Sequence, residues 1–451
     1  MSVKFGTDGV RGVANGELTP ELVLALGRAA ARVLGGDEWF TGRDTRRSGP
    51  LLQAALAAGL AAEGATVIDL GVVPTPAVAT MCAARGGAGA VVSASHNAFS
   101  DNGVKLFAPG GTKLSDEVEE RLEAELASIT SGAVGAPAPP VGAEVGTVTV
   151  EPTAVDWYVS QLVASLDGRR LDGLKVVVDC ANGAASVVGP QALRAAGAEV
   201  VVIHAEPNGT NINEKSGSTH PDDLRRAVGD AGADAGLAFD GDADRVLAVD
   251  GNGDLVDGDH LIAICALDLR SRGLLPQETV AVTVMTNLGF RLAMEEHGIH
   301  VHETPVGDRH ILAALEAHGW ALGGEQSGHL IFRSLATTGD GILTGLQVLD
   351  VLARTGRPLD VLAGEAMTRL PQVLRNVRVD HRAPDLVDLL AGEVARVEGE
   401  LGPRSRVLIR PSGTEPLVRV MVEAATEAAA ANAADQLAEA VTRVLGPAST
   451  P

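Results

Sequence analysis

The chain has 451 residues, a formal net charge of −22, and 45% hydrophobic but only 2% aromatic residues. This length exceeds what one hydrophobic core holds, since domains usually contain roughly 100–150 residues. The negative charge argues against nucleic acids and membrane surfaces as partners, because both are met by basic patches. Cores poor in aromatic residues must be built from Ala, Val, Leu and Ile, which suits helices packed on sheets.

The three cysteines lie far apart and lack CxxC spacing, which favours reduced thiols over disulfides or zinc. The N-terminal sequence has no apolar segment of the kind found in signal peptides. The longest apolar run, near residues 59–84, is interrupted by Glu63 and Asp69. We therefore expect a cytoplasmic protein that has no membrane partner.

Along the chain, the same order of elements is predicted three times: a strand, a helix, a glycine, a second strand and then a third short strand. The copies begin at WFTGRD (39–44), LKVVVDC (174–180) and VAVTVMT (280–286). Strands that alternate with amphipathic helices indicate βαβ units. The predicted fold is α/β: three similar mixed α/β domains with largely parallel sheets, plus a smaller C-terminal α+β domain, around a central cleft.

Composition suggests where these domains end. The Pro/Gly/Ala-rich stretch at residues 131–146 reads as a linker that closes the first domain, and the repeat is lost beyond about residue 370. The expected domains are residues 1–150, 151–255, 256–370 and 371–451.

Each third strand ends in a short polar cluster: SASHN (93–97), DGDADR (240–245) and GEQSGH (324–329). Ligands of open α/β sheets bind beyond the carboxyl ends of strands. Three equivalent domains therefore offer three equivalent loops, which we expect to converge on one site.

The DGDADR loop has aspartates at every second position, namely Asp240, Asp242 and Asp244. Two carboxylates about 4 Å apart repel by roughly 4 kcal/mol at an effective dielectric constant of about 20, so three converging ones favour a bound cation. Oxygen ligands suit a hard ion, and Mg²⁺ with substrate phosphate completing its shell is the common arrangement. An EF-hand is excluded because Arg245 stands where its glycine belongs. The alternative for this segment alone is an acidic, solvated turn.

The SASHN loop offers a serine without nucleophile-elbow glycines or an obvious hydrolase triad. A serine also serves as a phosphate carrier, since phosphoserine has about two negative charges and three acceptor oxygens. Beside a metal, Ser95 is the candidate carrier, because phosphoryl transfer needs little beyond positioning, charge neutralisation and a general acid or base. Lys105 is the candidate acid or base, and His96 is expected to orient groups. Taken alone, the stretch equally fits a polar helix N-cap.

Two further segments offer contacts to a phosphorylated sugar. In GEQSGH, Glu325, Ser327 and His329 can hydrogen-bond sugar hydroxyls, although a lone histidine is more often structural. RPSGTEPLVRV gathers two arginines, hydroxyls and a glycine around one turn, which in so acidic a chain favours phosphate over a plain hairpin turn. The candidate phosphate-binding residues there are Arg410, Ser412, Gly413, Thr414 and Arg419.

Taken in chain order, five motifs resemble those of the α-D-phosphohexomutase superfamily over the whole chain. They are GTDGVRG (6–12), SASHN (93–97), DGDADR (240–245), GEQSGH (324–329) and RPSGTEP (410–416). Within this superfamily, NINEKSGSTH (211–220) is similar to the subgroup that interconverts glucosamine 6-phosphate and glucosamine 1-phosphate, for amino-sugar nucleotide and cell-wall precursor synthesis. Action on glucose or mannose phosphates is the alternative within the superfamily.

The resemblance implies an isomerase whose serine, matching Ser95, carries a phosphate and passes it through a bisphosphorylated sugar. Glucosamine 1,6-bisphosphate would be both intermediate and primer, and one Mg²⁺ per chain would bind the three aspartates and a phosphoserine oxygen. The other residues that match functional positions of the superfamily are Arg11 and Arg245 beside the phosphoserine, Lys105 as acid or base, Glu325, Ser327 and His329 at the sugar, and the Arg410 loop at the second phosphate. The expected partner is a phosphorylated hexosamine, and the expected assembly is a monomer or homodimer.

Two other classes fit parts of the pattern. A phosphatase with an Asp nucleophile fits Asp240 and Asp242 loosely, but its motif requires Thr or Val at the place of Asp244. A non-catalytic sugar-phosphate sensor would keep the cleft without turnover, yet no expected catalytic residue is missing. Release of inorganic phosphate would distinguish a phosphatase from a mutase.

Overall fold

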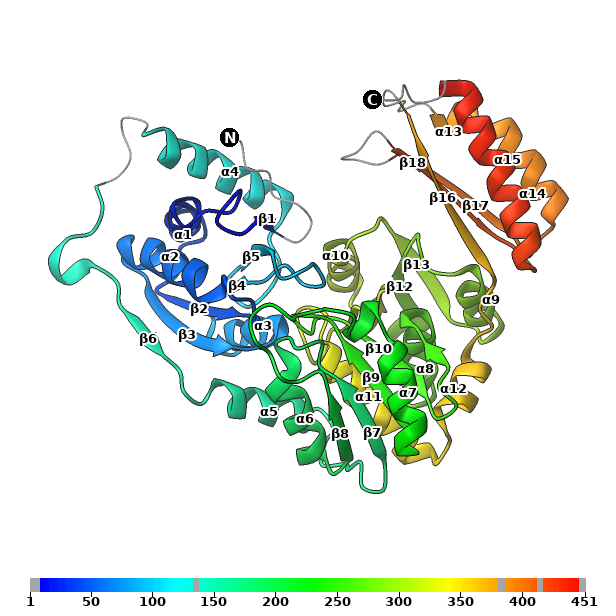
Figure 1. Cartoon of the computed structure of the whole chain (residues 1–451), viewed down its shortest axis with the longest axis horizontal. Coiled ribbons are helices and arrows are strands. Elements are labelled where there is room, and N and C mark those ends of the chain that lie inside the picture. Colours follow the sequence, from blue (N-terminus) through cyan, green and yellow to red (C-terminus); the bar gives the residue numbers. More distant parts are fainter. Residues whose placement is uncertain (1–8, 133–137, 380–385, 412–416, 446–451) are drawn as a thin grey trace. The chain divides into compact units, whose positions relative to one another are not determined.

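The computed structural model describes residues 9–132, 138–379, 386–411 and 417–445. It forms two compact units (Figure 1): residues 1–285 with 299–366, and residues 286–298 with 367–451. Among the described helices, none is both long and apolar enough to cross a membrane.

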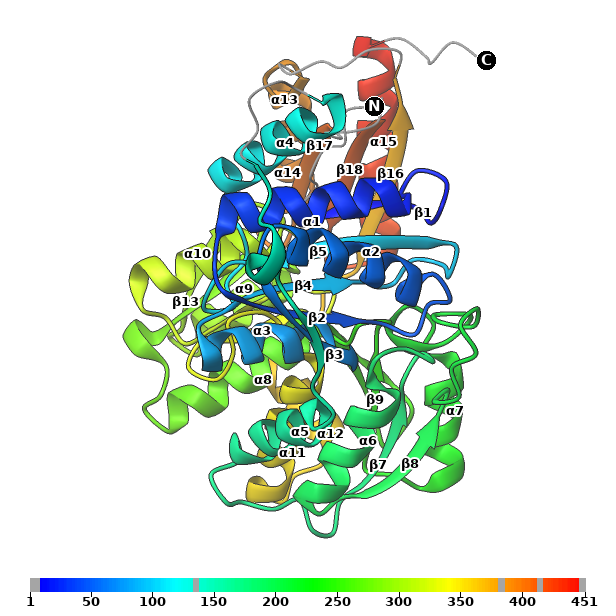
Figure 2. The same cartoon turned by 90° about the vertical axis from the view of Figure 1, so that its left-hand side faces the viewer.

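The first sheet has six strands in the order β1-β5-β4-β2-β3-β6. The pairs of β2 with β3 and β4, and of β3 with β6, are parallel, whereas β5 runs antiparallel to β4 and β1. Helices α1 and α2 cover one face and α3 the other (Figures 1 and 2). The elements are β1 (Val10–Val13), α1 (Pro20–Leu34), β2 (Glu38–Arg43), α2 (Gly49–Ala62), β3 (Thr66–Val72), α3 (Thr75–Arg85), β4 (Ala88–Val92), β5 (Asp101–Phe107), α4 (Asp116–Ser131), the 3-10 helix η1 (Gly142–Glu144) and β6 (Val148–Val150).

The second sheet has five strands in the order β11-β10-β9-β7-β8. Strand β7 pairs in parallel with β8 and β9, and β10 is antiparallel to β9 and β11. The elements are α5 (Ala154–Ala164), β7 (Lys175–Asp179), α6 (Ala185–Ala196), β8 (Glu199–Ile203), η2 (Gly217–Thr219), α7 (Asp222–Ala231), β9 (Ala235–Phe239), β10 (Val246–Asp250) and β11 (Leu255–Val256).

The third sheet has four strands in the order β13-β12-β14-β15, and only the β14–β15 pair is antiparallel. Helix α9, although it lies between β12 and β13 in the chain, belongs to the second unit. The elements are α8 (Gly258–Ser271), η3 (Pro276–Glu278), β12 (Thr279–Thr283), α9 (Leu288–Glu296), β13 (His300–Thr304), α10 (Asp308–His318), β14 (Leu322–Gly324), β15 (Leu330–Phe332), α11 (Gly341–Thr355) and α12 (Leu359–Ala366).

The three sheets share one arrangement, seen as β3-β2-β4-β5, β8-β7-β9-β10 and β13-β12-β14-β15. The predicted βαβ repeats are therefore confirmed. In each sheet, the third strand of the repeat has a parallel neighbour on one side and an antiparallel return strand on the other. The polar loop predicted from the sequence is the connection between these last two strands, so each loop is held at both ends by the sheet.

Apolar side chains of small and medium size fill the cores, as the composition requires. In the first sheet, Val67, Val92 and Val104 are fully buried against Leu56 and Leu60 of α2. Helix α1 has a favourable N-terminus. The N-cap residue Thr19 accepts a hydrogen bond from the Leu22 N–H through its hydroxyl at 3.3 Å, and Pro20 occupies the first helical position.

The second unit contains a three-stranded antiparallel sheet in the order β16-β18-β17. Its core includes Val420 and Val422 of β18 and Leu437 and Val441 of the last helix, all nearly or fully buried. The elements besides α9 are β16 (Gln372–Arg378), α13 (Leu386–Leu389), α14 (Ala391–Leu401), β17 (Arg406–Pro411), β18 (Leu417–Glu423) and α15 (Glu427–Leu445). This is the predicted smaller α+β domain.

Candidate active site

Ser95 lies at the carboxyl end of β4, in the loop that leads to β5, and its side chain is buried. Its backbone has φ 51°, in the left-handed region that residues other than glycine rarely adopt. Such conformations cluster at functional sites, where surrounding contacts hold them. The Ser95 hydroxyl donates a hydrogen bond to Asp240 Oδ2 at 2.6 Å and lies 3.4 Å from His96 Nδ1.

Asp240, Asp242 and Asp244 converge after β9, with one carboxylate oxygen of each lying within 4.8 Å of those of the other two. All three side chains are buried. Asp242 Oδ1 is buried and has no hydrogen-bond partner among the residues that the structure describes, an expensive arrangement for a carboxylate unless a cation takes it up. The all-oxygen donor set and this unpartnered oxygen fit a hard divalent ion such as Mg²⁺.

The pKa values of Asp240 and Asp244 are shifted in opposite directions. Burial, assisted by the Asp244 and Asp242 charges, raises the pKa of Asp240 well above its ordinary value. Burial would also raise the pKa of Asp244, but Lys105 and His329 outweigh it and hold that pKa well below the ordinary value. Ionisation of the Asp240 carboxyl is therefore unfavourable unless a cation binds to the trio.

Two side chains from the first sheet reach the same carboxylates. Lys105 of β5 is buried, and its Nζ lies 2.7 Å from Asp242 Oδ2 and 2.9 Å from Asp244 Oδ2. The Thr75 hydroxyl, at the start of α3, donates to Asp242 Oδ2 at 2.5 Å. The candidate acid or base thus contacts two members of the acidic trio, and the candidate phosphate carrier contacts the third, Asp240.

His96 and the two predicted arginines form the more open side of this site. Arg245 Nη1 lies 3.3 Å from His96 Nδ1, and Arg245 Nε lies 3.8 Å from Asp244 Oδ1. Burial, Arg245 and Arg11 lower the pKa of His96, so its ring is neutral at neutral pH. Arg11 lies in β1 opposite Gly103 of β5. A neutral His96 suits the predicted orienting role.

The GEQSGH loop adjoins the acidic loop. The Val246 N–H donates to Gly328 O at 3.0 Å, and a Cβ on Gly328 would lie 2.0 Å from Val246 O, so only glycine fits there. Glu325 is half-buried and accepts the Gly307 N–H at 3.3 Å, and Ser327 is exposed.

His329 is buried at the base of this loop. Its Nε2 lies 3.2 Å from Asp308 Oδ2 and its Nδ1 lies 3.8 Å from Asp244 Oδ1. Burial would lower the pKa of His329, but Asp308 and Asp244 raise it to about 10. Lys113 also forms an ion pair with Asp308. The Gly339 nitrogen also lies 3.1 Å from His329 Nε2, so the ring is held between three neighbours, and its predicted sugar contact stays a prediction.

In the second unit, Arg410 of β17 lies directly opposite Arg419 of β18, and both are exposed. Side chains in such pairs have Cβ atoms about 4.5–5.5 Å apart, and like charges there repel. The pair suits an anionic ligand. The other predicted residues of this segment, Ser412, Gly413 and Thr414, lie outside the described residues.

Sequence reasoning missed several buried polar residues that support the Ser95 loop. Asp44 and Arg46 follow β2, and Asn213 lies in the NINEKSGSTH segment; each contacts this loop or its neighbour Ser93. The sequence prediction considered polar residues only after the third strand of each repeat. The carboxyl end of the first strand is also a place where ligands of α/β sheets bind, and it would have pointed to Asp44.

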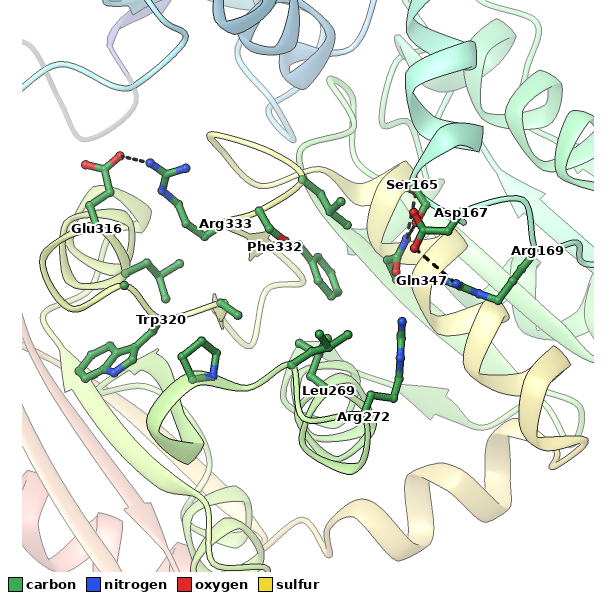
Figure 3. Close-up of a pocket in the computed structure, with 17 residues that line it drawn as sticks. Ser165, Asp167, Arg169, Leu269, Arg272, Glu316, Trp320, Phe332, Arg333 and Gln347 are labelled. Carbon is green, nitrogen blue, oxygen red and sulfur yellow. Dashed lines mark hydrogen bonds and ion pairs between the residues drawn. The ribbon is translucent and has the colours of Figure 1, made fainter.

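A cavity of about 550 Å³ lies elsewhere in the first unit (Figure 3), and none of the predicted site residues lines it. Each of its three arginines already has a carboxylate partner: Arg333 lies 3.3 Å from Glu316, Arg169 lies 2.8 Å from Asp350, and Arg272 lies 3.2 Å from Asp268. We therefore place the candidate site at the three loops and not in this cavity.

Four family models match consecutive parts of the chain. All four are described as phosphoglucomutase/phosphomannomutase domains: α/β/α domain I at residues 2–133, domain II at 156–253, domain III at 257–370 and the C-terminal domain at 374–440. The chain belongs to the phosphoglucomutase/phosphomannomutase family. The predicted superfamily, fold class and isomerase class are confirmed by this membership.

Individual relatives agree with the family. A protein named phosphoglucosamine mutase from Frankia casuarinae is 55% identical over 458 residues, covering 98% of this chain and 99% of its own. The predicted likeness to the glucosamine subgroup is thus confirmed.

Two solved structures share the fold. A phosphoglucomutase/phosphomannomutase family protein from Burkholderia thailandensis superposes with a TM-score of 0.81 at 27% identity, covering 99% of this chain and 98% of its own. An Aspergillus fumigatus N-acetylphosphoglucosamine mutase, solved with GlcNAc-6P and magnesium, has a TM-score of 0.70 at 21% identity, covering 99% and 96%.

Proposed function

We infer that this phosphohexomutase interconverts glucosamine 6-phosphate and glucosamine 1-phosphate, with Ser95 as the phosphate carrier. The observation that supports it most is the contact of the Ser95 hydroxyl with Asp240, within a buried trio of aspartates that also contacts Lys105. The full-length relative named phosphoglucosamine mutase supports the choice of sugar.

The reaction proceeds as two phosphoryl transfers. In the first, the bond between phosphorus and the Ser95 oxygen breaks, and phosphorus bonds to the free 1-hydroxyl oxygen of glucosamine 6-phosphate. The sugar hydroxyl proton leaves to a base, and Ser95 keeps the electron pair of the broken bond. In the second transfer, the Ser95 oxygen bonds to the 6-phosphorus of glucosamine 1,6-bisphosphate, and the bond between that phosphorus and the sugar O6 breaks. O6 takes a proton back from the protonated base, and glucosamine 1-phosphate leaves. Inorganic phosphate is released in neither transfer.

The residues divide these tasks. Asp240, Asp242 and Asp244 would hold one Mg²⁺, which when bound neutralises charge on the transferring phosphoryl group. Lys105 is positioned to exchange the sugar hydroxyl proton, and Arg245 contributes positive charge on the open side. Arg11 is assigned a place beside the phosphate of phosphorylated Ser95. Neutral His96 orients the transferring group.

Specificity for the amino sugar requires an acceptor aimed at C2. Glu325 is our candidate, since it is the acidic group of the sugar loop and is only half-buried. Ser327 and His329 are assigned to the neighbouring sugar oxygens. Near-isosteric substituents are separated by only about a hundredfold unless polar groups of the site would be left unpaired. We therefore expect preference, with residual use of glucose phosphate.

In the second unit, we assign Arg410, Arg419 and the segment Ser412, Gly413 and Thr414 to the substrate's other phosphate. The cross-strand arginine pair supports this assignment. The three cysteines, all buried and free, fit the reducing cytoplasm in which we place the reaction. A monomer or homodimer stays our expectation for the assembly.

The test compares kcat/KM for glucosamine, glucose and mannose 6-phosphates at equal Mg²⁺, each primed with its own bisphosphate, while inorganic phosphate is measured. We expect the highest value for glucosamine 6-phosphate without stoichiometric phosphate release. Equal or better use of the hexose phosphates would remove the glucosamine assignment. Phosphate release at the rate of substrate loss would indicate a phosphatase instead.

A further inference from the structure

Arg46 is wholly buried three residues after the end of β2, and its guanidinium group is unusually well supplied with acceptors. An arginine has five N–H donors in a planar fork. Here Nε donates to Asp44 Oδ2 at 2.8 Å, and the other four go to backbone carbonyls of a single loop. The acceptors are Ala98 O, Asp101 O at 3.1 Å, Ser95 O at 2.9 Å and Asn97 O at 2.9 Å.

The peptide groups on both sides of the Ser95 Cα are fixed by the same cluster. The Ser95 N–H donates to Ser93 Oγ at 3.0 Å, and Ser93 Oγ in turn donates to Asp44 Oδ2 at 2.6 Å. Because Asp44 also accepts from Arg46, the N–H side and the carbonyl side of Ser95 are tied to one ion pair. This accounts for a non-glycine residue that stays at φ 51°.

The second repeat completes the arrangement. Asn213 Nδ2 donates to Ser95 O at 2.9 Å and to Asn97 O at 3.0 Å, so two of the four carbonyls receive donors from both repeats. Gly241 lets the chains approach this closely, since a Cβ there would lie 2.5 Å from Ser95 O and 2.9 Å from Asn213 Nδ2.

We propose that Arg46 is a positioning residue for phosphoryl transfer, holding the 95–101 loop so that the Ser95 oxygen stays aimed at the acidic trio, with Asn213 as its partner from the second repeat. The proposal rests on the proposed function of Ser95. Arg46 does not touch substrate, because its side chain is wholly buried and all five donors are engaged. Its effect must therefore appear in the transfer step and not in substrate binding.

Arg46→Lys keeps the charge that faces Asp44 but cannot reproduce the planar fork. Arg32→Lys is the matched control: Arg32 lies in the same domain, its side chain is 11% exposed, and it pairs with Glu63 and Glu125. Both variants should lower the melting temperature. Only Arg46→Lys should slow the chemistry, because misplacing a reacting group by about 1 Å costs on the order of a hundredfold in rate.

The experiment measures the melting temperature, kcat and KM for glucosamine 6-phosphate, and the single-turnover rate at which glucosamine 1,6-bisphosphate phosphorylates the dephosphorylated enzyme. For Arg46→Lys we expect kcat and the single-turnover rate to fall at least about tenfold further than for Arg32→Lys, with KM changed less than about threefold. Equal kcat in the two variants at matched melting temperature would overturn the proposal. A change confined to KM would overturn it as well.

Asn213→Ala provides the second route if Arg46→Lys does not fold, since it removes two of the carbonyl contacts and leaves Asp44 paired. A smaller loss of kcat at constant KM is expected, and unchanged kcat would count against the arrangement. If the wild-type enzyme interconverts nothing, the proposed function fails separately. Hydrogen exchange then decides about Arg46: the amides of residues 95–101 must exchange faster in Arg46→Lys than in Arg32→Lys, and equal rates would overturn the positioning role.

Discussion

At the scale of residues, the three aspartates differ in what each carboxylate already contacts. Asp240 Oδ2 accepts the Ser95 hydroxyl, and Asp242 Oδ2 is shared by Lys105 and Thr75. Within the described part of the chain, Asp242 Oδ1 has no hydrogen-bond partner although it is buried. The spacing of every second residue predicted the trio. The supporting Thr75 begins α3 and Asp44 follows β2, and only the tertiary structure brings them close to the site.

We predict that Asp242→Asn weakens Mg²⁺ binding by at least tenfold, because even residues that only support metal ligands usually cost about 10–100-fold when lost. Isothermal titration of the dephosphorylated protein with Mg²⁺ measures this without relying on turnover, and kcat as a function of Mg²⁺ concentration gives the second readout.

Asp250→Asn is the control for this substitution. Asp250 is a buried aspartate at the end of β10, and its Oδ1 accepts the N–H groups of Asn252 and Asp254, at 2.9 Å each. Its replacement should leave Mg²⁺ affinity unchanged. An Asp242→Asn protein with wild-type Mg²⁺ affinity would refute the assigned metal site.

At the scale of elements, the repeated strand order was predictable because short apolar runs alternate with amphipathic helices, and these runs form strands that are almost wholly buried. The return strands were harder to predict, since β5, β10 and β15 follow polar loops. Strands β5 and β10 also contain charged residues, and β15 is only three residues long. Contacts between elements were beyond sequence reasoning. One example joins α5 to α11, where the Tyr158 hydroxyl donates to Asp340 Oδ2 at 2.5 Å while Asp340 Oδ1 caps α11 at the Leu343 N–H.

We predict that Tyr158→Phe lowers the free energy of unfolding by about 1–3 kcal/mol, the usual cost of leaving a buried acceptor without its donor. Burial raises the pKa of Asp340 to about 6, so its carboxyl is protonated in the folded protein at pH 5 and ionised at pH 7.5. The loss should therefore be larger at pH 7.5. Urea unfolding at both values measures it, and a loss that is equal or larger at pH 5 would contradict this account.

A second element-level prediction concerns His204, which follows β8. Its Nδ1 lies 3.0 Å from Asp179 Oδ2 at the end of β7, and its Nε2 lies 3.2 Å from Asp223 Oδ2 of α7, where Arg226 also pairs with Asp223. The interaction with Asp179 raises the pKa of His204, Asp223 adds to it, and partial burial opposes it. The folded state therefore binds this proton more tightly than the unfolded state does.

A raised pKa contributes stability that is fully present below the unfolded-state value of about 6.5 and is lost as pH rises through the folded-state pKa. We predict that His204→Asn, which tolerates the positive φ of this position, destabilises the protein most below about pH 6.5 and progressively less above it. Urea unfolding from pH 5.5 to 9 provides the comparison. A difference independent of pH would show that the histidine acts through packing alone.

At the scale of the whole molecule, an acidic chain places one lysine and several arginines at the loops proposed to bind a phosphorylated sugar. Lys105 and Arg245 contact the acidic trio in the first unit, and Arg410 faces Arg419 across a strand pair in the second. The net charge of −22 argued against nucleic acids and membrane surfaces as partners, and motifs spread over the whole chain predicted the family. The pairing of side chains between repeats could not be predicted from the sequence, because a strand-end pattern says which edge of the sheet a residue occupies but not which neighbour it meets.

The central claim is that the phosphoryl group on Ser95 goes to the sugar and not to water. The direct measurement starts from enzyme labelled with ³²P on Ser95, mixed with unlabelled glucosamine 6-phosphate and Mg²⁺ for less than one turnover. Our account predicts that the label appears first in glucosamine 1,6-bisphosphate and then in glucosamine 1-phosphate, with almost none as inorganic phosphate, and that Ser95→Ala cannot be labelled. Label that leaves the enzyme as inorganic phosphate, or that peptide mapping finds on Ser93, would contradict it.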